Sequence, residues 1–178
     1  MNPDLGLLIR QLRGAYSGEL AAGYAYRGHW HSVRDAAERE RIQVIEQEEW
    51  HHRELVGDLL RQLGAKPSLA REAIFFMIGK TIALICHIGG HFIPMYGAGK
   101  LERTNIVEYE DAARYATRCG HEEMVECLLT MAETEWEHER YFRERVAGHP
   151  LLRLFKLWEP APPKETIRAA ANLWSGGL

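Results

Sequence analysis

Two tetrapeptides of this sequence, Glu49–His52 and Glu135–His138, read Glu-x-x-His, with Trp directly after the Glu. They begin 86 residues apart, and a further glutamate precedes each one, Glu19 by 30 residues and Glu102 by 33 residues. Side chains at positions i and i+3 of a helix share a face, so each tetrapeptide can present a carboxylate and an imidazole to one point. Two such pairs, with one glutamate from each of two further helices, form the ligand set of a di-iron or di-manganese centre in a four-helix bundle.

A metal ligand must point into the core, and each predicted ligand continues an apolar stripe of its helix. In the second predicted helix, the stripe that passes through Ile45 contains Glu49 and His52. The adjacent pair Glu48 and His51 has the same spacing but lies off this stripe, so we leave it out of the site. The predicted metal ligands are Glu19, Glu49, His52, Glu102, Glu135 and His138.

The donor atoms indicate which metal would bind. Four carboxylates balance two divalent cations when both histidines are neutral, and oxygen and imidazole donors suit iron or manganese. We therefore expect two iron ions, with manganese as the alternative metal. The three cysteines form no Cys-x-x-Cys pair, so they predict neither a zinc ribbon nor a rubredoxin-type site. The alternative interpretation is that the six residues are solvated surface charges with coincidental spacing.

Composition places the chain among ordinary globular proteins. Its 178 residues suffice for one domain with a sizeable core, and 46% are hydrophobic and 26% charged. The formal net charge of −3 and the lack of a basic block give no reason to expect nucleic-acid binding. The start of the sequence lacks the features of a secretory signal, and scattered thiols suit a reducing compartment, so we expect a cytoplasmic protein.

Helical periodicity extends along the whole chain, and no alternating strand pattern or Asn-Gly hairpin interrupts it. We expect Gly89-Gly90 and Pro94 to interrupt the helical structure after an apolar segment. Pro-rich residues 160–163 are expected to form a spacer. The expected fold is all-α, an antiparallel four-helix bundle over residues 1–158 with an additional apolar helix, then a spacer and a short helix over 159–178. The expected helices cover about 3–31, 35–63, 69–88, a segment ending near 118, 122–146, a short amphipathic piece at 151–158, and a small terminal helix.

Residues 81–99 contain no Asp, Glu, Lys or Arg, which raises the question of a membrane span. The four glycines, one proline and two histidines in this stretch argue against a span. We expect a buried helix of the bundle, and a surface that touches lipid is the alternative.

From Gly18 to Gly28 the chain reads Gly-Glu-Leu-Ala-Ala-Gly-Tyr-Ala-Tyr-Arg-Gly and resembles the demethoxyubiquinone hydroxylase family. The resemblance continues through Glu102 and both Glu-x-x-His tetrapeptides, over about residues 15–144. It implies a ferritin-like bundle whose di-iron centre activates dioxygen and hydroxylates a quinone ring during ubiquinone synthesis. The sequence departs from the family at Ala15-Tyr16-Ser17, where the family has Asp-His-Ala, and at Glu108, where the family has His.

An oxygenase would need further residues beside its metals. Tyr109 follows Glu102 on the same helical face and is a candidate hydrogen-bond donor or radical partner, with plain core packing as an equal alternative. A small apolar substrate would need an apolar approach, for which Phe75, Ile78 and Ile82 are the candidate binding residues.

Three functions are therefore compatible with the sequence: an oxygenase, a ferroxidase or rubrerythrin-like iron-handling protein, and a helical interaction protein without a catalytic metal. The resemblance and the apolar segment favour the oxygenase, acting on a quinone-like substrate. The expected partners are that substrate and an electron donor that the sequence does not identify. A homo-oligomer, and peripheral contact with the inner face of a membrane, are compatible with the apolar segment.

Overall fold

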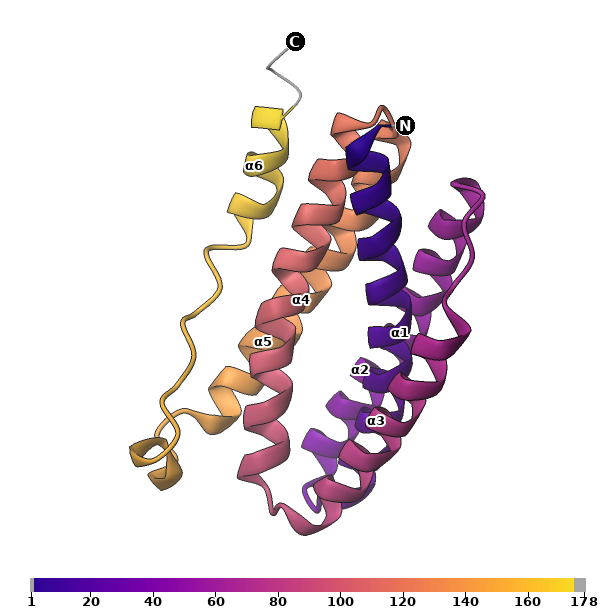
Figure 1. Ribbon diagram of the computed structural model, residues 1–178. Coiled ribbons are helices and arrows are strands. Elements are labelled where there is room, and N and C mark those ends of the chain that lie inside the picture. The colour runs from indigo at the N-terminus through magenta and orange to yellow at the C-terminus, as the bar shows by residue number, and fades with distance from the viewer. Residues whose placement is uncertain (1, 175–178) are drawn as a thin grey trace. The chain divides into compact units, whose positions relative to one another are not determined.

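The computed structural model describes residues 2–174, which are mainly helical and contain no strand (Figure 1). This confirms the predicted all-α fold class. The elements are α1 (Pro3–Ser32), α2 (Ala36–Gln62), α3 (Leu69–Ile88), α4 (Phe92–Arg118), the short 3-10 helix η1 (Glu122–Met124), α5 (Val125–Val146), the short 3-10 helix η2 (Pro150–Arg153) and α6 (Glu165–Trp174).

The chain divides into two compact units. The α1–α3 unit contains residues Leu12–Pro94, and the α4–α6 unit contains the residues before Leu12 together with those from Met95 onward. Each unit holds two of the four long helices that carry predicted ligands, because most of α1 pairs with α2 and α4 pairs with α5.

Local signals fix the ends of α2, which agree with the predicted range of about 35–63. The side chain of Asp35 caps the start by accepting a hydrogen bond of 2.9 Å from the Glu38 backbone N–H. At the other end, Gly64 has a φ of +64°, its N–H donates to the Arg61 carbonyl, and the Ala65 N–H donates to the Leu60 carbonyl. These bonds satisfy terminal carbonyls of the helix, and the left-handed conformation that they require suits glycine.

Two local predictions are wrong. Pro94 does not interrupt the chain, because it lies in the first turn of α4, where the N–H that proline lacks has no partner within the helix. Residues 151–158 do not form one helical piece either. Only the single turn of η2, Pro150–Arg153, is helical there, and a turn, a bend and irregular backbone follow it.

Within the α1–α3 unit, α1 and α2 run antiparallel. Arg27 of α1 donates to Glu46 of α2, and Arg53 of α2 donates to the backbone carbonyl of Tyr16 on α1. Residues 16–27 of α1 therefore lie opposite residues 46–53 of α2.

Helix α3 packs on α1 through glycine. A Cβ atom added at Gly79 of α3 would lie 2.6 Å from the Ala21 carbonyl oxygen, and one added at Gly28 of α1 would lie 2.4 Å from the Ala83 Cα. Real Cβ atoms do not approach other atoms so closely, so the two backbones are in direct contact. The contacts pair residues in ascending order along both helices, so α1 and α3 are parallel.

The remaining faces of α3 are exposed, which corrects the expectation of a buried bundle helix. Only Gly79 and Cys86 of this helix are buried, whereas Ile74 is 59% exposed and Met77 61% exposed. Hydrophobic periodicity could not reveal this exposure, because the apolar residues of α3 are distributed over all faces of the helix. Among residues 2–174, no helix combines the length and apolar character that crossing a membrane requires.

Replacing Gly79 by Ala should separate α3 from α1. The added methyl group meets backbone atoms that cannot move independently, so we expect the free energy of unfolding to fall by about 1–3 kcal/mol. Chemical denaturation monitored by circular dichroism measures this change. The control is Gly97→Ala in α4, where an added Cβ has no atom within 4 Å, so the better helix propensity of Ala should leave stability unchanged or raised. Equal stability of the two variants would contradict the close contact.

Candidate metal centre

The α1–α3 unit gathers three predicted ligands. Glu19 comes from α1, and Glu49 and His52 come from α2, on the stretches that the antiparallel pairing places opposite each other. All three side chains are buried, with at most 3% of their surface exposed. One ligand atom from each lies within 4.8 Å of the ligand atoms of the other two, so they form a half-site of two carboxylates and one imidazole.

The α4–α6 unit gathers the other three predicted ligands into an equivalent half-site. Glu102 comes from α4, and Glu135 and His138 come from α5, and each of them is 0% exposed. Their ligand atoms also lie within 4.8 Å of one another. His138 Nδ1 is 3.6 Å from Glu135 Oε2, as expected for side chains one turn apart on one helix face.

The burial pattern of α2 agrees with the stripe chosen from the sequence. His52 is buried, whereas His51 is exposed, and its ring lies 3.9 Å from the carboxylate of exposed Glu54. Glu49 is fully buried, whereas Glu48 is partly exposed and pairs with Arg41. The side chains that the stripe placed inward are therefore the buried ones, and their role as ligands is a prediction that metal binding would test.

Burial raises the pKa of Glu102 well above the ordinary carboxylate value. The negative charge of Glu135 and a hydrogen bond with it raise this pKa further, and His138 and Asn105 oppose the shift. Asn105, which the sequence analysis did not single out, donates 2.8 Å from Nδ2 to Glu102 Oε2 and so orients this carboxylate. The only signal for it in the sequence was its position one turn after Glu102.

The donor set fits divalent iron or manganese. Each half-site supplies two carboxylates and one imidazole, and one divalent cation would cancel the charge of two ionised carboxylates. Carboxylates that repel each other in a buried site are the arrangement that a bound cation relieves. No cysteine belongs to either half-site.

Two further buried carboxylates flank the ligands, and the sequence analysis missed both. Glu46 lies one turn before Glu49 and accepts hydrogen bonds from the Trp30 indole (2.6 Å), the Trp50 indole (3.0 Å) and Arg27 (2.8 Å). Glu139 directly follows His138 in the α4–α6 unit and is 2% exposed. Their spacing from the ligands was visible in the sequence, but the Trp30 donor to Glu46 and the Trp158 donor to Glu139 come from other segments.

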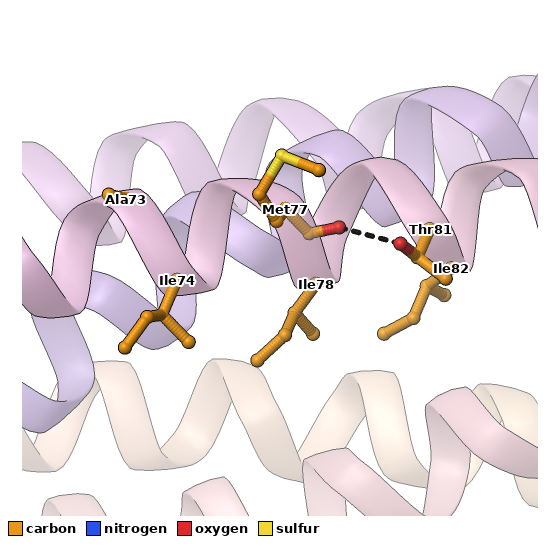
Figure 2. Close-up of a pocket in the computed structure, with 6 residues that line it drawn as sticks. All are labelled: Ala73, Ile74, Met77, Ile78, Thr81 and Ile82. Carbon is orange, nitrogen blue, oxygen red and sulfur yellow. Dashed lines mark hydrogen bonds between the residues drawn. The ribbon is translucent and has the colours of Figure 1, made fainter.

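Tyr109 is buried on α4, at 2% exposure, and its catalytic role stays a prediction. Of the predicted substrate-binding residues, Ile78 and Ile82 line an open apolar depression of about 600 Å³ on α3, and Phe75 does not. Ile74, Ile78 and Ile82 project from the same side of the helix in Figure 2. None of the six predicted ligands lines this depression, so it is an apolar surface of α3 rather than an extension of a half-site.

The raised pKa of Glu102 predicts how the metal-free protein responds to pH. The folded state holds a proton that the unfolded state releases above the ordinary value of 4.5, so stability should fall as the pH rises through and above that value. The variant Glu102→Gln removes the titrating group but keeps its shape. We expect its metal-free form to melt at a higher temperature than the natural chain at neutral pH, with a difference that shrinks towards pH 4.

Thermal melts of chelator-treated protein across this pH range measure the effect. A gain of about 1 kcal/mol would raise the melting temperature by roughly 2–4 °C for a chain of this size. Parallel melting curves for both proteins at every pH would contradict the assignment.

The sequence of this chain matches one family of known proteins. A family model described as ubiquinone biosynthesis protein COQ7 matches residues 7–139, a stretch that contains all six predicted ligands. A search of curated proteins and a search of solved structures each returned no match. Because the family model covers most of the sequence, the chain belongs to the COQ7 family of ubiquinone biosynthesis proteins, the demethoxyubiquinone hydroxylases of the ferritin-like di-iron superfamily.

Proposed function

We propose that this protein is a di-iron oxygenase that hydroxylates a small apolar, quinone-like substrate. The observation that carries the proposal is the repeated half-site: each unit buries two glutamates and one histidine with their ligand atoms within 4.8 Å of one another. Membership of a hydroxylase family supports the reaction class.

In this proposal the six residues hold two iron ions, and His52 and His138 each bind one of them through a neutral imidazole. The four carboxylates then balance the charge of two ferrous ions. Bound iron of this kind supplies dioxygen activation. The chain's own contribution is to hold the ligands in a buried environment that excludes bulk water, and to orient Glu102 through Asn105.

The proposed substrate class rests on α3. This helix exposes isoleucine and methionine side chains around an apolar depression, and an apolar ring loses its contact with water when it binds such a surface. Ile78 and Ile82 are the candidate contact residues, because both line the depression. The same exposed side chains would also support peripheral contact with a membrane surface, where a quinone-like substrate would be dissolved.

The choice of ligand face can be tested by metal content. His52→Ala removes a predicted ligand and should lower bound iron by at least half, because a metal loses its only imidazole in that half-site. Iron per chain, measured by elemental analysis after expression in iron-supplemented cells, gives the result. The matched control is His51→Ala, which should retain the natural iron content because His51 is exposed on the same helix. Equal losses of iron in both variants would show that the wrong face of α2 was assigned to the metal.

The reaction class can be tested by following both dioxygen and an organic product. We expect the reduced, iron-loaded protein to consume dioxygen and to hydroxylate a short-chain quinone analogue. Ile78→Trp should fill the depression and reduce product formation by about tenfold, which corresponds to 1.4 kcal/mol of barrier, with unchanged iron content. The control is Leu84→Trp, on an exposed position of α3 outside the depression.

Rapid ferrous-iron oxidation with mineral formation and without an organic product would instead support the ferroxidase alternative. An undiminished product yield from Ile78→Trp would remove the α3 depression from the substrate path.

A further inference from the structure

Trp158, in the segment after α5, contacts the part of the α4–α6 unit that carries predicted ligands. The Trp158 indole Nε1 donates to Glu139 Oε1 at 2.6 Å, and Arg143 Nε donates to the same oxygen at 2.8 Å. Arg143 also donates from Nη2 to the Trp158 backbone carbonyl at 2.8 Å, and its guanidinium carbon lies 4.9 Å from the centroid of the Trp158 ring. Glu139, Arg143 and Trp158 therefore form one closed cluster, called here the Trp158 latch.

The Trp158 latch includes Glu139, which lies on the turn of α5 that carries the predicted ligands. Glu139 follows His138 directly and lies one turn after Glu135. A carboxylate that is 2% exposed needs strong donors, and an arginine and an indole N–H supply them. The Arg143 bond lies within α5 and orients the Glu139 carboxylate, whereas the Trp158 bond comes from outside the helix and so restrains the rotation of α5 beside His138.

The other side of the Trp158 ring contacts α4. A Cβ atom added at Gly99 would lie 2.4 Å and 2.5 Å from two atoms of the Trp158 ring and 2.9 Å from the Phe142 Cβ. The α4 backbone therefore packs directly on the indole, one turn before Glu102. Tyr96 supports the same segment, because its hydroxyl donates to the Lys156 carbonyl at 2.7 Å and its ring stacks edge-on against Trp158.

We infer that Trp158 is a positioning residue for the half-site of Glu102, Glu135 and His138. Its indole touches α4 one turn from Glu102 and is bonded to α5 beside His138, so it sets the separation of the two helix turns that carry the ligands. This inference rests on the proposed metal-binding function. Trp158 lies outside residues 7–139, so nothing in the family match assigns it a role.

The test is a titration of metal-free protein with Co²⁺, whose visible absorption reports both occupancy and ligand geometry. Trp158→Phe keeps an aromatic ring against Gly99 but removes the N–H donor to Glu139. We expect Co²⁺ to bind the affected half-site about 10–100-fold more weakly and the visible bands to change, because loss of a residue that orients a ligand has effects of this size. Circular dichroism establishes that the variant is folded.

The chain offers a matched control in Trp136→Phe. The Trp136 indole also donates a hydrogen bond to the segment after α5, at 2.8 Å, but to the Pro162 carbonyl rather than to Glu139. This variant loses the same kind of bond to the same segment, so a general loosening of the segment would affect both variants. We expect its Co²⁺ affinity and spectrum to match those of the natural chain.

Two failures can be told apart. If the natural chain takes up no Co²⁺ and His138→Ala behaves like it, the metal-binding proposal falls and the role of Trp158 falls with it. If the natural chain binds Co²⁺ and His138→Ala binds it weakly, but Trp158→Phe matches Trp136→Phe in affinity and spectrum, then only the role of Trp158 is overturned. Should Trp158→Phe fail to fold, Glu139→Gln tests the same cluster, with weaker Co²⁺ binding expected and unchanged binding overturning the inference.

Discussion

The burial of carboxylates governs how each unit of this protein is built. An ionised carboxylate away from water is costly, so each one needs a cation, a proton or several hydrogen-bond donors. Glu46 and Glu139 have donors from arginine and tryptophan, whereas Glu102 has a raised pKa and faces a second carboxylate, Glu135. The two kinds of buried carboxylate therefore differ: the first is held by arginine and tryptophan donors, whereas the second is relieved by a proton or by a bound cation.

The carboxylates with fixed donors lie beside the predicted metal ligands on the same helices. Glu46 lies one turn before Glu49, and Glu139 lies next to His138, so each helix that carries a Glu-x-x-His tetrapeptide also carries a carboxylate bound by an indole and a guanidinium. The bonds that come from outside the helix, from Arg27 and Trp30 to Glu46 and from Trp158 to Glu139, restrain its rotation whether or not a metal is present. The ligands can then meet a metal without a large rearrangement of the backbone, which favours tight binding.

Local features made much of this structure predictable from the sequence. The Asp35 cap, the glycine stop at Gly64 and the apolar stripe through Ile45 act over a few residues, so helix bounds and the buried face of α2 followed from them. The exposure of α3 did not follow, because an apolar helix has no polar face to show which side meets water. The partners of Glu139 did not follow either, because Trp158 reaches it from 19 residues away along an irregular path.

The contact of α3 with α1 has a consequence for how such a protein can change over evolutionary time. Gly28 and Gly79 join these helices through their backbones, and Glu72 and Phe76 add side-chain contacts, so the outward side chains of α3 are not the ones that hold it in place. Mutations at Ile74, Met77 or Ile82 can therefore alter the outward surface at little cost in folding stability. A lineage could acquire a new ligand preference on α3 while the residues that secure the helix stay the same.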